Sequence, residues 1–201
     1  TQINFKLEDT IGLISLIALN EKGYKKIIEL SSKSYLENDA HLDPHVDIKE
    51  LYKNHEGLLI LSGSIQGLFG KLFDKGRFSQ IQQVYQGLLS TYADRFYIEI
   101  QRHGDQNEKS FEKYNLQQSY DLKTPIIATN EVFYLDKEMH EAHDALICIG
   151  SKTYVNEKSR IKYSDQHYFK TDEEMSQLFS DIPEALENNY NLPFRCNFRP
   201  M

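Results

Sequence analysis

The sequence has little cysteine and no long hydrophobic run. Only Cys148 and Cys196 occur among its 201 residues, and they lack the Cys-x-x-Cys spacing of redox and zinc motifs. Two thiols without a secretory leader predict a reduced, cytoplasmic protein rather than a disulfide framework. The longest apolar run, Ile11–Leu19, is interrupted by Ser15 and falls well short of the roughly 20 residues that span a bilayer. We therefore expect no membrane contact.

Basic residues are also in the minority. The chain has 23 Lys and Arg against 30 Asp and Glu, which gives a formal net charge of −7. Nucleic-acid affinity depends largely on Lys and Arg neutralising phosphates, so this surface alone is a poor candidate for tight DNA or RNA binding. The 40% of hydrophobic residues, with 12% aromatic, can form the core of one folded domain and exclude a disordered tail.

Apolar runs alternate with helix-like stretches along the chain. Strands are predicted at Ile11–Leu19, Gly57–Ser62, Phe96–Gln101 and Pro125–Thr129. Helices are predicted from the N-cap Asn20 to Tyr35, and over Asp47–Lys53, Leu68–Phe73, Phe78–Tyr92, Asn107–Tyr120, Asp136–Ile149, after the capping box Thr171–Glu174, and from Pro183. Strand followed by helix, repeated, is typical of parallel pairing, so the predicted class is α/β.

Few ligand-type side chains follow these strands. In parallel α/β folds the chemistry gathers at the carboxyl ends of strands, and there the sequence offers Glu99, His103 and Glu131. Three groups on three loops are few for a metal centre. Each also has a structural interpretation: Glu99 as the polar face of a strand, His103 as a solvated loop residue and Glu131 as a turn residue.

Other catalytic patterns are missing from the sequence. There is no phosphate-binding glycine loop and no Gly-x-Ser-x-Gly elbow. His140 and His143 lie three residues apart on a predicted helix, close enough to share an ion. Because His143 shares a stripe with Met139, Leu146 and Ile147, we expect a packed, hydrogen-bonded histidine there instead.

Several segments, in order along nearly the whole chain, resemble the amino-terminal PHP (polymerase and histidinol phosphatase) domain of the bacterial DNA polymerase III alpha subunit family. They are Leu58–Gly63, Phe96–Gly104, Pro125–Glu131, Glu141–Gly150, Tyr168–Met175, Phe179–Asn188 and Arg195–Phe198. The resemblance implies a distorted (β/α)7 barrel. It also implies that the first barrel strands, with their His-x-His motif, would precede Thr1. Residues 1–150 would then be the carboxyl-terminal part of the barrel, and residues 151–201 an exit segment leading toward the polymerase core.

The resemblance further implies a degenerate metal site. A cysteine common in metal-binding members is replaced by Ser64, and the histidine after the third strand matches His103. The Asp-x-His pair after the fourth strand is occupied by Glu131 and Phe133, and Glu99 is a possible remnant ligand. A phenyl ring cannot coordinate a cation. We therefore expect no metal, no cofactor and no catalytic residue in this segment.

The implied parent is a DNA-directed DNA polymerase that uses Mg²⁺ and meets DNA and nucleotides through parts outside this segment. The segment itself would be an inactive scaffold for folding and for docking a proofreading exonuclease subunit and other replicase subunits. The alternative is an active metal-dependent phosphoesterase, a 3′–5′ exonuclease or a pyrophosphatase, that uses His103, Glu99 and Glu131. A third possibility is a stand-alone binding module. Unpaired strand edges would favour self-association.

Overall fold

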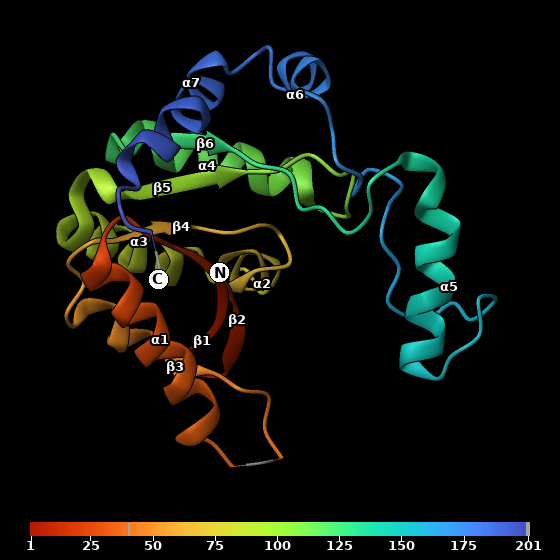
Figure 1. Ribbon diagram of the computed structural model, residues 1–201, viewed down its shortest axis with the longest axis horizontal. Coiled ribbons are helices and arrows are strands. Elements are labelled where there is room, and N and C mark those ends of the chain that lie inside the picture. Colours follow the sequence, from red (N-terminus) through yellow and green to blue (C-terminus); the bar gives the residue numbers. More distant parts are fainter. Residues whose placement is uncertain (40, 200–201) are drawn as a thin grey trace.

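The computed structural model describes residues 1–39 and 41–199, and in that range the chain forms one mixed α/β sheet with helices around it (Figure 1). The strands are β1 (Gln2–Leu7), β2 (Thr10–Ala18), β3 (Val46–Asp47), β4 (Leu58–Leu61), β5 (Phe96–Ile100) and β6 (Ile126–Ala128). They lie in the order β3-β1-β2-β4-β5-β6. The predicted α/β class is confirmed.

Seven α-helices and four short 3₁₀ helices connect these strands within the described residues. The α-helices are α1 (Glu21–Leu36), α2 (Leu68–Asp74), α3 (Phe78–Tyr92), α4 (Glu108–Leu122), α5 (His140–Ser151), α6 (Asp172–Leu178) and α7 (Pro183–Asn191). The 3₁₀ helices are η1 (Ile48–Tyr52), η2 (Ala93–Arg95), η3 (Lys137–Met139) and η4 (Leu192–Arg195). The single helix predicted over Asp136–Ile149 is therefore wrong in detail, because its first turn is the separate 3₁₀ helix η3.

Strand direction corrects the expectation of parallel pairing throughout. β4, β5 and β6 are parallel, as predicted, but β2 runs antiparallel to both β1 and β4. β1 was not predicted at all. Only Glu8 and Asp9 separate it from β2, and Glu8 has a positive φ of 53°. A connection this short closes an antiparallel hairpin, since a parallel crossover needs a dozen or more residues.

Local capping explains where two predicted helices begin. The Asn20 side chain accepts a hydrogen bond from the backbone N–H of Gly23 at 3.2 Å, which satisfies a free donor in the first turn of α1. At α6 the Thr171 hydroxyl accepts from the Glu174 backbone at 3.2 Å, and the Glu174 carboxylate accepts from the Thr171 backbone at 2.8 Å. Both caps were predicted from the sequence and are confirmed.

The central strands are buried on both faces. Alternate residues of one strand enter different hydrophobic clusters: Leu58 and Ile60 join the larger cluster with α1–α4, whereas Leu59 and Leu61 join a smaller cluster with Leu192. This follows from the two-residue period of a strand. It also explains why the sequences of β4 and β6 are continuous apolar runs rather than alternating ones.

The last α-helix of the chain packs back onto the sheet. Helix α7 lies along β6, and Asn188 Nδ2 donates to the backbone oxygen of Ile126 at 2.8 Å. One edge of the sheet is thus covered, which limits the surface for the predicted self-association. The predicted exit segment, 151–201, is described as far as Arg199, and its last two residues lie outside the described part.

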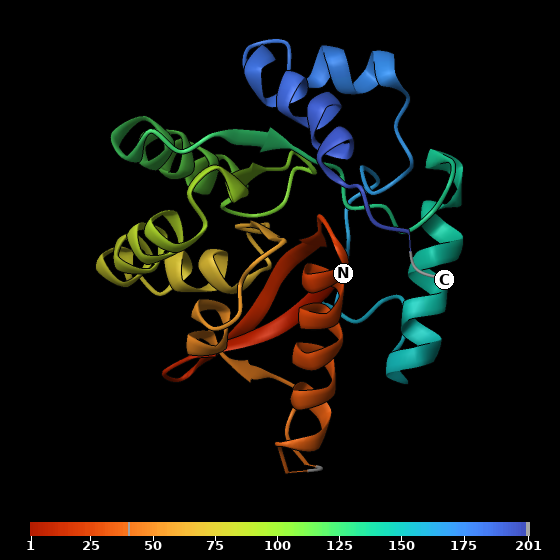
Figure 2. The same ribbon diagram turned by 60° about the vertical axis from the view of Figure 1, so that its left-hand side comes forward.

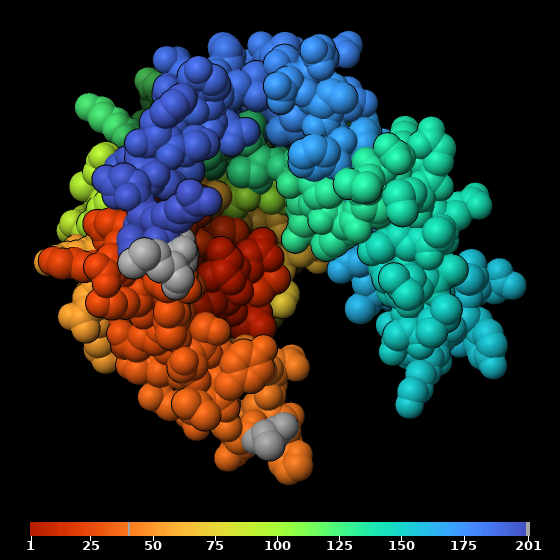
Figure 3. Space-filling view, in the orientation of Figure 1, coloured from red at the N-terminus to blue at the C-terminus, as the bar shows by residue number. Residues whose placement is uncertain are grey.

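Helix α5 stands apart from the rest of the chain (Figures 1 and 2). The surface is hollowed between α5 and the end of α1, as the space-filling view shows (Figure 3). One connection leads from the sheet to α5 and another returns from it, and an isolated β-bridge between Tyr134 and Tyr168 joins the two. We call residues 135–166 the α5 arm. In the described part of the chain, no helix has the length and apolar character needed to cross a membrane.

Candidate functional site

Glu99 lies at the centre of the strand ends and is almost wholly buried, with 4% of its surface exposed. Its carboxylate accepts hydrogen bonds from the backbone N–H of Gly63 at 3.0 Å, from Gln101 Nε2 at 3.0 Å, and from the Thr129 hydroxyl. These three donors follow β4, β5 and β6. Burial raises the pKa of the Glu99 carboxyl. Glu99, the predicted remnant ligand, therefore links the ends of three strands, and its carboxylate oxygens accept hydrogen bonds from protein groups.

Ser64 lies close to this junction. Its hydroxyl oxygen accepts a hydrogen bond from the Gln66 backbone at 3.2 Å, as in a local serine turn. Ser64 and Glu99 both line one small polar cavity of about 10 Å³, together with Glu108. The structure thus brings these two predicted site residues together, although the space between them is no larger than a single water requires.

His103 is held by Glu108 rather than exposed in a loop. Its backbone N–H points at both Glu108 oxygens, at 2.8 and 2.9 Å, and the Gly104 N–H donates to the same carboxylate at 2.7 Å. Burial opposes ionisation of Glu108, but these hydrogen bonds prevail and lower the pKa of its carboxyl. The interpretation of His103 as a solvated residue is wrong, because only 2% of its surface is exposed.

Both ring nitrogens of His103 face protein groups. Nδ1 lies 3.6 Å from a Glu108 oxygen, and Nε2 lies 3.0 Å from Asn130 Oδ1 and 3.2 Å from the backbone N of Glu131. Asn130 is itself fixed, since its amide donates to the Tyr168 backbone oxygen at 2.7 Å. Asn130 and Glu131, which follow β6, are thereby hydrogen-bonded to His103, which follows β5.

His167 belongs to this site, and sequence reasoning missed it. Its ring stacks on His103 with centroids 4.1 Å apart and planes 5° apart, and its Nδ1 lies 3.1 Å from the Glu131 backbone oxygen. Its Nε2 is buried without a hydrogen-bond partner among the described residues. Burial, with the nearby His103, lowers the pKa of His167 to about 4. The loop around it has no periodic pattern, so the sequence held no signal for its burial.

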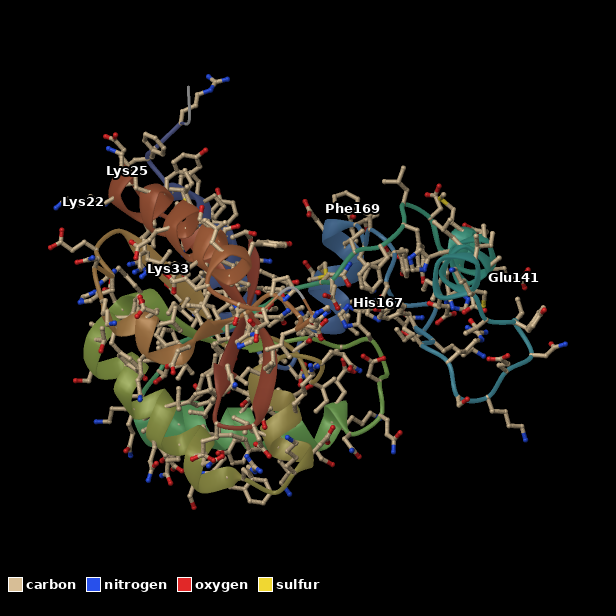
Figure 4. The ribbon with its side chains drawn as sticks, turned by 90° about the horizontal axis from the view of Figure 1, so that it is seen from below. Lys22, Lys25, Lys33, Glu141, His167 and Phe169 are labelled. Carbon is tan, nitrogen blue, oxygen red and sulfur yellow. The ribbon has the colours of Figure 1, made fainter. Side chains whose placement is uncertain are left out.

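Phe133 extends the stack toward the α5 arm (Figure 4 shows the position of His167 between sheet and arm). Its ring lies 4.9 Å from that of His167 and 5.5 Å from that of His143, with planes 28° and 7° apart. We call His103, His167, Phe133 and His143 the ring column. His143 is packed, as predicted, but through ring stacking. The prediction that His143 is buried along an apolar stripe of the helix is wrong, since Met139 and Leu146 of that stripe are 44% and 63% exposed.

The donor set around the ring column does not fit a metal ion as it is arranged. The Glu99 oxygens and both His103 nitrogens face protein groups, and Phe133 has no donor atom. Burial raises the pKa of the Glu131 carboxyl, and the Nε2 of His167 is a single buried nitrogen without a hydrogen-bond partner among the described residues. In residues 1–39 and 41–199, no group of three or more His, Cys, Asp or Glu is placed to hold a metal. The metal-free state of the site remains a prediction.

Arg102, beside His103, joins the sheet to the segment after residue 170. Its guanidinium contacts the carboxylates of Glu112 and Asp181 with two nitrogens each, and it also donates to the Leu178 backbone oxygen at 2.6 Å. The same side chain lies over the Phe179 ring at 5.0 Å. Arg102, Leu178 and Asp181 line a cavity of about 590 Å³ that His103 also lines.

A model of the PHP domain matches residues 3–103, half of the chain, including β1, β2, β4 and β5. The chain belongs to the PHP domain family. The resemblance predicted from the sequence is thereby confirmed. Of the predicted site positions in this PHP domain, Ser64, Glu99 and His103 lie within the matched range, while Glu131 and Phe133 follow it.

Curated relatives of the PHP chain are DNA polymerase III alpha subunits. This chain is 36% identical to the alpha subunit of Caulobacter vibrioides over 185 residues, 37% identical to the alpha subunit of Rickettsia conorii over 200 residues, and 35% identical to the alpha subunit of Vibrio cholerae over 190 residues. These matches cover 92%, 98% and 94% of this chain but only 16%, 17% and 16% of the relatives. The chain thus spans about a sixth of their length.

Proposed function

We propose that this PHP chain is part of a DNA polymerase III alpha subunit, a cytoplasmic enzyme that carries out DNA-templated DNA synthesis with Mg²⁺. The observation that carries the proposal is the similarity to such subunits at 35–37% identity over 92–98% of the chain. Similarity that runs through β1 to α7, rather than through one motif, argues for the same place in the larger protein. DNA and nucleotides are then bound by other parts of that protein.

Within the subunit, we propose a scaffold role for the PHP segment. Support comes from the strand ends, where Glu99 joins three strands and Phe133 joins the sheet to the α5 arm. Such groups hold a fold together, which supports a structural role. The partners of the scaffold are the polymerase core, a proofreading exonuclease subunit and other replicase subunits.

Primer extension tests the polymerase proposal. The purified full-length subunit that contains this segment should extend a primed DNA template with deoxynucleotides and Mg²⁺, and should stop when Mg²⁺ is chelated. Failure of the folded subunit to extend any primed template would refute the proposal.

Metal content and nuclease activity test the scaffold role. The full-length subunit should contain less than stoichiometric Zn²⁺ or Mn²⁺ by elemental analysis and should not release nucleotides from a 3′ end on its own. Added proofreading subunit should bind it and supply that release. Stoichiometric metal, with a nuclease or pyrophosphatase activity that His103→Ala abolishes and Glu138→Ala leaves intact, would establish the active phosphoesterase instead.

A further inference from the structure

Helix α5 has one face that is packed within the arm and an opposite face that is apolar. The inner face is used within the arm: Cys148 is buried, Asp144 pairs with Arg160 at 2.5 Å, and His143 stacks on Phe133. The outer face carries Met139, Ala142, Leu146 and Ile149, which recur at helical spacing.

The outer face is nevertheless bare. Leu146 is 63% exposed and Ile149 is 75% exposed, and Met139, just before the helix, is 44% exposed. The flanking loops add further large apolar side chains, namely Leu135, Tyr154, Val155 and Ile161, each more than half exposed. Met139, Leu146 and Ile149, which share one face by helical spacing, form what we call the α5 patch. Single exposed apolar residues are ordinary, but a concentration of this size in one short segment marks a contact surface.

The base of the arm is fixed, so the α5 patch is held at a defined place. The Phe133 backbone N–H donates to the His167 oxygen at 2.9 Å, next to the bridge between Tyr134 and Tyr168. The ring column adds stacked contacts from His103 to His143. Figure 4 shows Glu141 on the side of α5 that points away from the sheet. The arm therefore holds the α5 patch in a defined position relative to the sheet.

Basic residues border this patch. Lys152, Lys158 and Lys162 are exposed, and the structure gives none of them an ion pair within the described residues. Glu138, Glu141 and Glu157 are exposed in the same segment, so a partner surface that matches the arm is apolar at its centre and carries charges of both signs at its rim.

We propose that the α5 patch packs against another part of the same polypeptide, an apolar surface in the polymerase part of the parent subunit. This rests on the proposed function. The matched segment makes up only 16–17% of the relatives, so most of their length is available in one chain, and the similarity spans the arm. A covalently attached partner is present at every concentration, which spares the subunit an exposed apolar patch that would drive aggregation.

Hydroxyl-radical footprinting of the full-length subunit, alone and dilute, tests this proposal. Leu36, on α1, is the internal reference, because it is 82% exposed and lies outside the arm. We expect Leu146 and Ile149 to be oxidised at least fivefold more slowly than Leu36, although all three are exposed in the structure described here. Equal oxidation of the three side chains would overturn the proposal.

Two further outcomes would also overturn it. Protection that arises only when the proofreading subunit is added would assign the patch to that separate partner. Protection that increases with protein concentration would assign it to a second copy. A matched pair of variants supplies a second measure: Leu146→Asp with Ile149→Asp should lower the melting temperature of the full-length subunit, whereas Leu36→Asp should not.

The footprint separates this proposal from the proposed polymerase function. Primer extension by the wild-type subunit with unprotected Leu146 and Ile149 would refute the docking surface alone. Protected side chains in a folded protein that extends no primer would refute the polymerase alone.

Discussion

The imidazole rings of His103 and His167 lie face to face, 4.1 Å apart, although one follows β5 and the other lies on the connection that returns from the α5 arm. Glu131 joins them, since its backbone N lies 3.2 Å from His103 and its backbone oxygen 3.1 Å from His167. Three loops that are distant in the sequence therefore share one buried contact. Its strength should decide how firmly the arm is attached.

Acid should weaken this contact through His167. Its folded-state pKa of about 4 lies below the ordinary histidine value of 6.5, so the unfolded chain binds more protons between these values. The stability contributed by neutral His167 is complete above about pH 6.5 and is lost as the pH falls toward about 4. In His167→Gln the urea midpoint should depend less on pH across this window. His41→Gln, at an exposed position, should retain the wild-type dependence.

Removing the Glu99 carboxylate should destabilise the strand ends. Glu99→Ala leaves the donors of Gly63, Gln101 and Thr129 without their shared acceptor, which should cost about 3 kcal/mol of unfolding free energy. Glu99→Gln keeps one acceptor oxygen and should cost about half of that. Urea denaturation measures both. If Glu99→Ala unfolded at the same urea midpoint as the exposed control Glu138→Ala, the hydrogen bonds of Glu99 would contribute nothing to stability.

Loss of Arg102 should loosen helices α6 and α7. Arg102→Ala removes the paired contacts to Glu112 and Asp181, which should lower stability by about 2 kcal/mol. Arg102→Lys should recover only part of it, because an ammonium cannot form the two-nitrogen contacts of a guanidinium. Hydrogen exchange of residues 172–191 should speed up in both variants, more in Arg102→Ala. Unchanged exchange in this segment would contradict the role of Arg102.

Shortening Phe133 should free the α5 arm while leaving the sheet intact. Phe133→Ala removes two stacked contacts, with His167 and His143, worth about 1 kcal/mol each. Proteolysis within residues 152–162 should become faster, while the amides of β4 and β5 keep their protection. Phe133→His retains a ring and should resemble the wild type. Equal loss of protection in the sheet would show that Phe133 supports the core instead.

Much of this fold could be predicted from local pattern. Phe78–Tyr92 was predicted with its observed bounds, since its apolar stripe and length are those of a surface helix. β1 was missed although Ile3, Phe5 and Leu7 alternate with polar residues, a signal of a half-buried strand that was present in the sequence. Antiparallel pairing of β1 and β2 followed from their two-residue connection, which the prediction could not use without β1.

The candidate site was predicted only in part. Position at or just beyond the carboxyl end of a strand identified Glu99 and His103, because parallel strands end at one edge of the sheet. Their hydrogen bonds to Gln101, Thr129 and Glu108 could not be predicted, since any of these side chains could equally have faced solvent. Nothing local indicated His167, which is buried by contacts with residues far away along the chain.

By itself, the sequence determined the α/β class, the helix caps, the apolar strands and the family to which the chain belongs. These depend on neighbouring residues, whose spacing sets periodicity and capping, and on the order of segments along the chain. Only the tertiary structure decided which strands run antiparallel, which donors surround Glu99, and that the outer face of α5 is left bare. Those properties arise from contacts between distant segments, and their free energies depend on burial that no local pattern records.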